Sequence, residues 1–249
     1  MLGSTLVYTG LVITTAGLIL VIKPLERLHV TSRSQGLAIL GIGVLLTGIG
    51  LSAPTRESRI DKSVTRLDEF MPVWQFNERH TIRIAASPQR VFDAVREVRA
   101  SEISLFNTLT SIRRGGRKTP ENILNPGDSS AILDVATRSG FIYLASDAPR
   151  EVVVGTMLIG PPRLRSNLTA EAFRNPLPSG SAVAAMNFLV TPDGPNASTL
   201  STETRVFANT PESRRRFAPY WRAIYPGSAI IRRMWLRAVR TRAMTPTTR

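Results

Sequence analysis

The sequence predicts an α+β domain that follows a pair of membrane-spanning helices. Two uncharged apolar runs occupy the first 54 residues, and a strand, two helices, several antiparallel strands and a long final helix follow in that order. About 195 residues remain to fold in water, which is enough for one domain with a hydrophobic core. We expect a helical hairpin over residues 1–54, a juxtamembrane linker over 55–73, the domain over 74–243 and a flexible tail over 244–249.

The hairpin prediction rests on two apolar runs. Residues 4–22 carry no charged side chain, and as a helix they would be about 28 Å long, close to the thickness of the hydrocarbon core. Residues 36–53 form the second run, in which Gly41, Gly43, Gly48 and Gly50 allow close helix packing. A cleaved signal peptide and dimerisation through these glycines are the alternatives, although residues 1–9 lack the cationic start of a signal peptide.

The distribution of basic residues predicts the orientation of this multi-pass anchor. Two spans place the domain and residue 1 on the same side of the membrane. The loop between the spans carries Lys23, Arg27 and Arg33, whereas Arg56, Arg59, Lys62 and Arg66 follow the second span. The excess of one positive charge favours a cytoplasmic domain.

Charge and composition restrict the partners. The chain holds 32 Lys and Arg against 18 Asp and Glu, a net charge of +14 that favours an anionic partner. The anchor favours an anionic lipid surface, and no nucleic-acid-binding motif is present. Cysteine is absent and histidine occurs only at positions 29 and 80, which excludes disulfides, Cys-ligated metals and His-rich metal sites. We therefore predict no metal and no cofactor.

The order of elements can be read along the chain. From Gln75, Phe76, His80, Ile82 and Ile84 alternate as in a strand, with Glu78 the one charged residue on their face. Ser87-Pro88 begins a helix that reaches Arg99, and a short helix covers 102–114. Strand-like runs then occupy 131–137, 141–146, 151–158, 181–191 and 199–208. Thr210-Pro211 begins a long helix that Pro226-Gly227 interrupts and Ser228 recaps.

This order of elements resembles the helix-grip fold of the START and polyketide-cyclase superfamily, also called SRPBCC. Residues 84–92, Ile-Ala-Ala-Ser-Pro-Gln-Arg-Val-Phe, resemble the superfamily's strand that runs into a Ser-Pro-capped helix, and residues 201–206 and 220–228 resemble a bacterial subgroup without a settled activity. The resemblance covers about residues 74–243. It implies a curved antiparallel sheet wrapped around the last helix, with an apolar chamber between them for lipids, sterols or polyketides.

The resemblance makes several residues candidates for ligand binding. Glu203 and Arg205 share one face of a strand and are a candidate charged pair inside the chamber; an exposed ion pair is the alternative. The apolar and aromatic candidates for the lining, each of which could equally be core, are Phe141, Tyr143, Met186, Phe188, Trp221 and Tyr225.

The last helix carries a second kind of candidate. Residues 212–249 hold ten arginines against Glu212 alone, and Arg233, Arg237 and Arg240 share a face that is a candidate for contact with anionic lipid.

The leading interpretation is a membrane-anchored module that binds or transfers a hydrophobic or lipid-like small molecule, without catalytic residues. A cyclase- or hydratase-like enzyme that uses the same chamber is the alternative. It would need an inward-facing acid or base among Glu203, Tyr143, His80 and Asp93.

Overall fold

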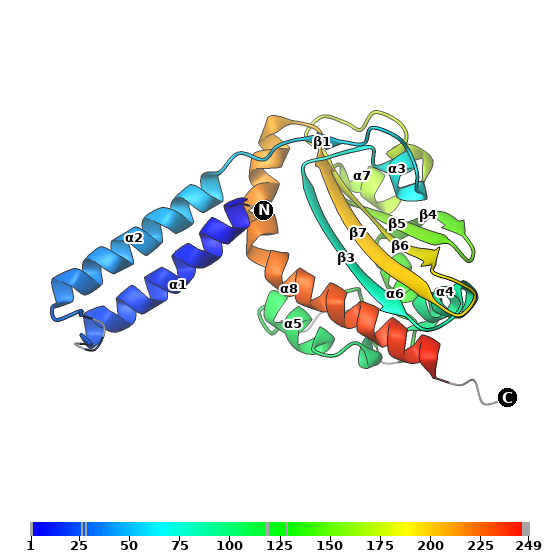
Figure 1. Ribbon diagram of the computed structural model, residues 1–249. Coiled ribbons are helices and arrows are strands. Elements are labelled where there is room, and N and C mark those ends of the chain that lie inside the picture. Colours follow the sequence, from blue (N-terminus) through cyan, green and yellow to red (C-terminus); the bar gives the residue numbers. More distant parts are fainter. Residues whose placement is uncertain (1, 26, 28, 118–119, 128, 246–249) are drawn as a thin grey trace. The chain divides into compact units, whose positions relative to one another are not determined.

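The structure is a computed structural model that describes residues 2–25, 27, 29–117, 120–127 and 129–245 (Figure 1). It divides into two compact units. The first contains residues 1–56 and 215–225, and the second contains residues 57–214 and 226–249. The predicted tail therefore lies almost entirely outside the described residues.

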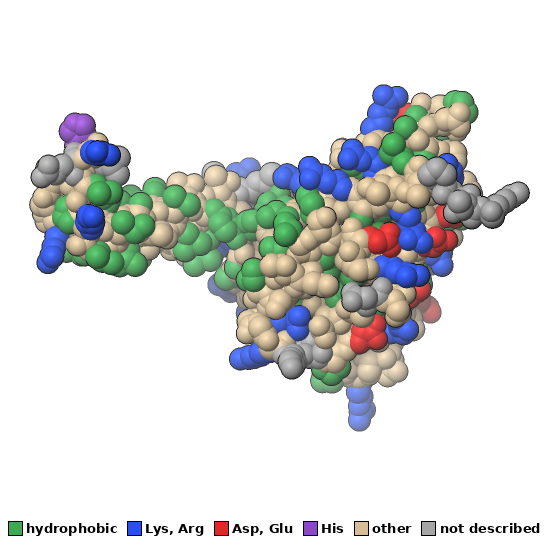
Figure 2. All heavy atoms as spheres, turned by 90° about the horizontal axis from the view of Figure 1, so that it is seen from below, with side chains coloured by type: hydrophobic (Ala, Val, Ile, Leu, Met, Phe, Trp, Pro, Cys, Tyr) green, Lys and Arg blue, Asp and Glu red, His purple; other side chains and the backbone are tan. Residues whose placement is uncertain are grey.

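The first unit contains the two apolar helices, α1 (Leu2–Ile22) and α2 (Arg33–Ser52), which lie side by side (Figure 1). Gly3–Ile22 and Arg33–Ser52 are each 20 residues long and apolar enough to cross a membrane. Hydrophobic side chains cover much of the visible hairpin surface, and basic side chains gather at its loop end (Figure 2). This distribution matches the length and polarity that the sequence predicts for two spans.

Glycines bring the two helices together at intervals of seven residues. The two series are Gly3, Gly10 and Gly17 of α1, and Gly36, Gly43 and Gly50 of α2. A Cβ atom at Gly43 would overlap the backbone of Thr14, and one at Gly17 would overlap the backbone of Leu40. Gly41 and Gly48 have no atom within 4 Å of such a Cβ. The predicted close packing is thus confirmed for Gly43 and Gly50 but wrong for Gly41 and Gly48.

One arginine closes the C-terminal end of α2. Arg222 is 4% exposed and donates hydrogen bonds to the backbone carbonyls of Leu51 and Ala53. The last carbonyls of a helix have no partner within the helix, so a buried guanidinium satisfies two of them at once. The hydroxyl of Tyr8 on α1 donates to the carbonyl of Ala223 at 2.6 Å. Both hairpin helices are therefore bonded to residues 222–223.

The second unit is built on a five-stranded antiparallel sheet in the order β3-β7-β6-β5-β4. The strands are β3 (Phe76–Ile84), β4 (Phe141–Asp147), β5 (Glu151–Ile159), β6 (Ala182–Pro192) and β7 (Ser198–Ala208). A separate two-stranded ladder pairs β1 (Ser58–Arg59) with β2 (Val73–Trp74). The long helix is α8 (Pro211–Met244), and its part after residue 226 runs along the concave side of the curved sheet (Figure 1), which confirms the helix-grip arrangement.

Both faces of the sheet are buried. The inner face, which carries Ile84, Met186, Phe188 and Leu200, packs with α4 (Pro88–Glu97), α6 (Ile132–Arg138) and the part of α8 after residue 226. The outer face carries Val153, Val183 and Ala185 and packs with α3 (Arg66–Phe70). The remaining short helices are the 3-10 turns Ala100–Glu102 and Glu171–Phe173, α5 (Phe106–Arg113) and α7 (Pro162–Ser166).

Three elements differ from the sequence prediction. Residues 132–138 form α6 rather than a strand: Ile132, Leu133, Val135 and Ala136 are buried at helical spacing, and a short apolar run does not distinguish the two states. Residues 55–73, predicted as a linker, contribute β1, α3 and the first residue of β2, and Leu67 is completely buried in the outer core. Finally, α8 continues through Pro226, although this proline cannot donate to the carbonyl of Arg222.

A buried carboxylate holds α3 on the sheet. Glu151 is completely buried; its oxygens accept hydrogen bonds from the amides of Arg66 at 2.8 Å and Leu67 at 3.2 Å, and from the side chain of Asn187 at 2.7 Å. The first amides of a helix lack partners within it and carry partial positive charge, so a carboxylate is well placed there. The segment predicted as a linker is thus fixed by a charge from the sheet.

Candidate functional site

The inner face of the sheet contains four of the predicted lining residues. Met186 and Phe188 are buried in the inner core, and Phe141 and Tyr143 are half-buried against it. The Phe188 ring lies 5.0 Å from the ring of Trp235 on α8. The structure therefore brings these four residues to the side of the sheet that faces α8, where they pack as core.

The other four predicted residues lie elsewhere. The ladder between β6 and β7 places Arg205 opposite Ala185 and Glu203 opposite Asn187, on the outer face. The pair was expected inside the chamber or exposed to solvent, and both expectations are wrong, because the side chains are 7% and 13% exposed on the opposite face. Trp221 and Tyr225 belong to the unit that contains the hairpin, where their rings are 6.1 Å apart.

Polar groups interrupt the inner core near β3. The buried Glu78 carboxylate contacts Nε2 of His80 at 2.8 Å through one oxygen and accepts a hydrogen bond from the Ser228 hydroxyl at 2.8 Å through the other. The Arg232 guanidinium contacts the sulfur of Met186 and lies 5.5 Å from the centre of the Trp235 ring. An acid, an imidazole and a cation thus face the same side of the sheet.

Burial changes the acid–base properties of two of these neighbours. Burial lowers the pKa of Arg232 to about 10, although the negative charge of Glu78 acts to raise it. The guanidinium therefore remains a cation at neutral pH. Burial raises the pKa of Tyr143, although the Arg96 guanidinium, 5.4 Å from the centre of its ring, acts in the opposite direction. Neither group changes its charge near pH 7.

Two buried polar atoms in the inner core have no hydrogen-bond partner in the described part of the chain. They are the Tyr143 hydroxyl and Nε1 of Trp235. Most buried polar atoms in proteins are hydrogen-bonded, and an unpaired one carries a desolvation cost of about 1–3 kcal/mol.

A hollow opens between β3 and α8, next to this cluster. The basic hollow, as we name it, has a volume of about 450 Å³, and its lining includes His80 and Ile82 of β3 and Arg233, Leu236, Arg237 and Arg240 of α8. Leu236 and Ile82 belong to the inner core or pack against it. Ile82 and Leu236 thus form an apolar floor, whereas His80, Thr81 and the three arginines of α8 make the rest of the lining polar.

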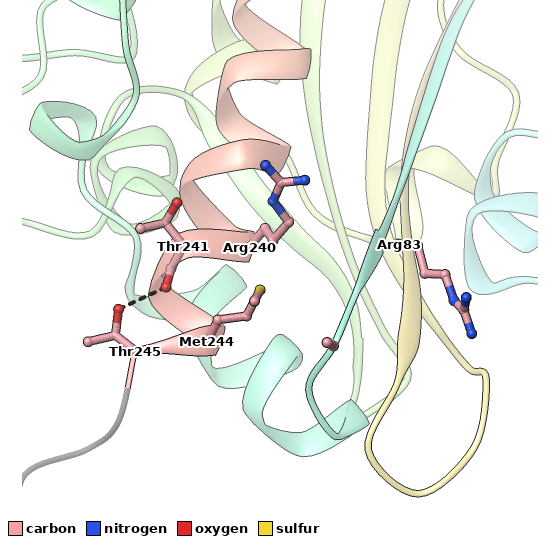
Figure 3. A pocket seen from close by; sticks show the side chains of 6 residues that line it. Arg83, Arg240, Thr241, Met244 and Thr245 are labelled. Atoms are coloured by element: carbon pink, nitrogen blue, oxygen red, sulfur yellow. Dashed lines mark hydrogen bonds between the residues drawn. The ribbon is translucent and has the colours of Figure 1, made fainter.

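A second hollow adjoins the first at Arg240. The terminal hollow, of about 570 Å³, is lined by Arg83, Ala85, Arg240, Thr241, Met244 and Thr245 (Figure 3). Figure 3 shows Arg240 and Met244 extending from α8 towards β3, whereas Arg83 points away from the helix. Of the residues singled out in the sequence, His80, Arg233, Arg237 and Arg240 line these hollows, and the eight predicted lining residues do not.

The sequence offered one signal for the missed residues. Glu78 occupies the apolar face of its strand, where a charge is expensive to bury unless it is paired, so its position predicted a buried partner. The partners His80 and Ser228 lie 2 and 150 positions away, and only the fold shows the second contact. The hydrogen bond of His80 to Glu78 suits a structural role, yet His80 also lines the basic hollow.

The described residues contain no cluster of three or more His, Cys, Asp or Glu side chains that could hold a metal ion. Comparison with known protein families finds no match, and comparison with curated proteins finds none either.

Several solved structures are similar in outline. A conserved protein from Geobacillus kaustophilus is 11% identical, with a TM-score of 0.35 over 68% of this chain and 95% of its own. An aromatase/cyclase, Zhui, from Streptomyces sp. R1128 is 9% identical, with a TM-score of 0.28 over 68% and 96%. Norcoclaurine synthase from Thalictrum flavum is 10% identical, with a TM-score of 0.30 over 77% and 99%. These values are too low to assign a function.

Proposed function

We propose that this protein binds a hydrophobic or lipid-like small molecule between β3 and α8, in a START-like domain that its N-terminal hairpin anchors in a membrane. The observation that carries the proposal is the basic hollow, whose apolar floor belongs to the inner core. Its volume of about 450 Å³ lies in the range of small-molecule sites, about 300–1,000 Å³. Sites of this kind combine apolar and polar groups, and here Ile82 and Leu236 lie beside His80, Thr81 and three arginines.

Membrane anchoring is the first part of this proposal. Two uncharged helices of 20 residues bury much more apolar surface in a bilayer than a helix lying on its surface does. We expect the full-length chain to stay in the membrane pellet after an alkaline carbonate wash, and a chain that begins at Glu57 to be released. Recovery of the full-length chain in the wash would contradict the anchor, and so would cleavage of residues 1–22 from the mature protein.

Ligand uptake is the second part. In neutral lipid nanodiscs that contain an uncharged photoreactive diacylglycerol, we expect labelling of peptides from β3 and from α8 around Leu236 to Met244. Ile82→Trp should reduce this labelling about tenfold, a factor that corresponds to 1.4 kcal/mol, because the indole occupies the basic hollow. Thr108→Trp places the same side chain on the exposed surface of α5 and serves as the control.

The uptake experiment has a clear negative result. Equal labelling of both tryptophan variants, or labelling confined to the hairpin, would contradict a site between β3 and α8.

A cyclase- or hydratase-like enzyme is the second candidate function, and the contact between His80 and Glu78 favours it. A carboxylate that orients an imidazole beside a hollow is an arrangement suited to general base catalysis. Mass spectrometry of the recovered ligand distinguishes the two functions, since a reaction changes the ligand's mass or fragmentation and binding alone does not. A reaction that His80→Gln abolishes without reducing uptake would identify the enzyme.

A further inference from the structure

Three arginines line the basic hollow without ion-pair partners. Arg233, Arg237 and Arg240 are exposed, recur at intervals of four and three along α8, and form no salt bridge with any described residue. By contrast, Arg242 on the same helix pairs with Glu97 and Glu102, each at 3.0 Å. Arg242 is thus paired within the domain, whereas these three arginines are presented to the hollow.

The neighbouring charges do not neutralise this group. Glu78 is a buried acid of the inner face, and its two oxygens already contact His80 and Ser228. Arg83 of the terminal hollow points away from α8 and lies 3.5 Å from Asp193. Among the described lining residues of the two hollows there is no carboxylate. The three guanidinium groups therefore create a positive potential that only a ligand or solvent ions can balance.

The shape of the hollows restricts the ligand further. At Arg240 the basic hollow meets the terminal hollow, where Met244 is 50% exposed and Ala85 is also exposed. An exposed methionine beside a row of cations offers apolar contact to a chain whose charged end lies at the arginines. A ligand that matches both parts has an anionic head and an apolar chain.

The number of cations favours one class of anion. A carboxylate carries one negative charge, whereas a phosphate monoester carries about 1.5 to 2 at pH 7 and three acceptor oxygens. Guanidinium groups bind phosphate through paired hydrogen bonds, which a single ammonium does not reproduce. We infer that the two hollows together bind a phosphomonoester amphiphile, with its phosphate at Arg233, Arg237 and Arg240 and its chain along Ala85 and Met244. This inference rests on the proposed ligand site and names its ligand class.

Calorimetric titration of the full-length chain in neutral detergent tests the inference. The probe is dihexanoyl phosphatidate, a phosphomonoester with short acyl chains. The first comparison probe, dihexanoylglycerol, keeps the chains without the phosphate, and the second, glycerol 3-phosphate, keeps the phosphate without the chains. We expect phosphatidate to bind at least about 100-fold more tightly than either, because charge-assisted hydrogen bonds and apolar contact both contribute.

The test variant is Arg233→Gln/Arg237→Gln/Arg240→Gln. It should weaken phosphatidate binding about 100-fold and weaken dihexanoylglycerol binding by a much smaller factor, because only phosphatidate offers a charge to the guanidinium groups. The control, Arg59→Gln/Lys62→Gln/Arg163→Gln, removes the same net charge from exposed positions outside the hollows and should stay within about twofold of the unmodified chain. The single change Arg240→Gln should weaken binding more than Arg233→Gln, since Arg240 lines both hollows.

Each failure has a distinct meaning. Equal losses in the test and control variants would overturn the inference, because total charge rather than the hollow would then bind the phosphate. Equal affinity for phosphatidate and dihexanoylglycerol would overturn the claim that the ligand has an anionic head group, and it would leave the proposed hydrophobic site intact. Equal affinity for glycerol 3-phosphate and phosphatidate would overturn the amphiphile in favour of a soluble phosphate. If none of the probes binds, the proposed function fails as well.

Discussion

Replacing Arg205 by methionine is expected to lower the free energy of unfolding by about 3–5 kcal/mol, the usual effect of removing one member of a buried ion pair. The Arg205 side chain is 7% exposed and bonds to Asp68 and Glu203, each at 2.7 Å, and to the carbonyl of Met71 at 3.0 Å. Methionine fills a similar volume, but it leaves the buried carboxylate of Asp68 without its cation.

Denaturant unfolding of the full-length chain in mild detergent would measure this change. Trp74 fluorescence is a suitable signal, because the Arg205 guanidinium lies 4.0 Å from the centre of the Trp74 ring. Arg83→Met is the matched control: its arginine is 74% exposed in a 3.5 Å pair with Asp193, and such pairs contribute at most about 1 kcal/mol. Similar losses in both variants would contradict the buried network.

The difference in unfolding free energy between the unmodified chain and Arg205→Met should depend on pH, and the direction of that dependence can be worked out. Burial raises the pKa of Asp68, but hydrogen bonds from the Val64 and Thr65 amides and from Arg205 outweigh it and hold the pKa below its ordinary value. A carboxyl whose folded pKa is depressed contributes stability above its unfolded pKa, and that contribution is lost as the pH falls through the folded pKa. The gap between the unmodified chain and Arg205→Met should therefore narrow below about pH 4.

Replacing Gly43 by valine is expected to separate α1 from α2. A Cβ at Gly43 would overlap the backbone of Thr14, so no side-chain rotation relieves the conflict and the helices must move apart. Overpacking of this kind costs about 1–3 kcal/mol or more. Close approach of small residues also supplies most of the dispersion contact between helices in lipid, and that contact would be lost.

Gly41→Val is the control for this prediction, because a Cβ there has no neighbour within 4 Å. The chain has no cysteine, so spin labels can be attached at Val12→Cys and Leu45→Cys, which replace exposed residues of α1 and α2. In lipid bilayers Gly43→Val should lengthen or broaden the distance distribution between the labels, and Gly41→Val should not. An unchanged distribution for Gly43→Val would show that the glycine series does not set the helix spacing.

The elements with strong end signals could be predicted from the sequence. Thr210 accepts a hydrogen bond from the amide of Ser213 and Pro211 occupies the first turn, so the start of α8 agrees with the prediction. The predicted interruption of this helix at Pro226-Gly227 was wrong, because apolar residues on both sides of the proline are buried and stabilise a continuous helix.

The candidate site was harder to predict, for a physical reason. The alternation of side chains along a strand correctly places Glu203 and Arg205 on one face. It shows which face points to the core only when the opposite face is polar. On β6 the residues from Ala182 to Phe188 are all buried, so both faces look apolar in the sequence. The short-range pattern therefore could not decide which face α8 covers. Ser228 lies on α8, so its contact with Glu78 of β3 could not be predicted without knowing which face of the sheet α8 covers.

The strand order leaves β3 and β4 as the two edges of the sheet, and each edge discourages pairing with a second molecule. Arg79 and Arg83 project as exposed cations from β3, and the register of β4 shifts between Tyr143 and Ala145. Charged side chains and irregular register are two means by which proteins block the addition of a foreign strand. Copies concentrated in the plane of a membrane would meet often, and these two edges would keep such encounters from growing into an intermolecular sheet.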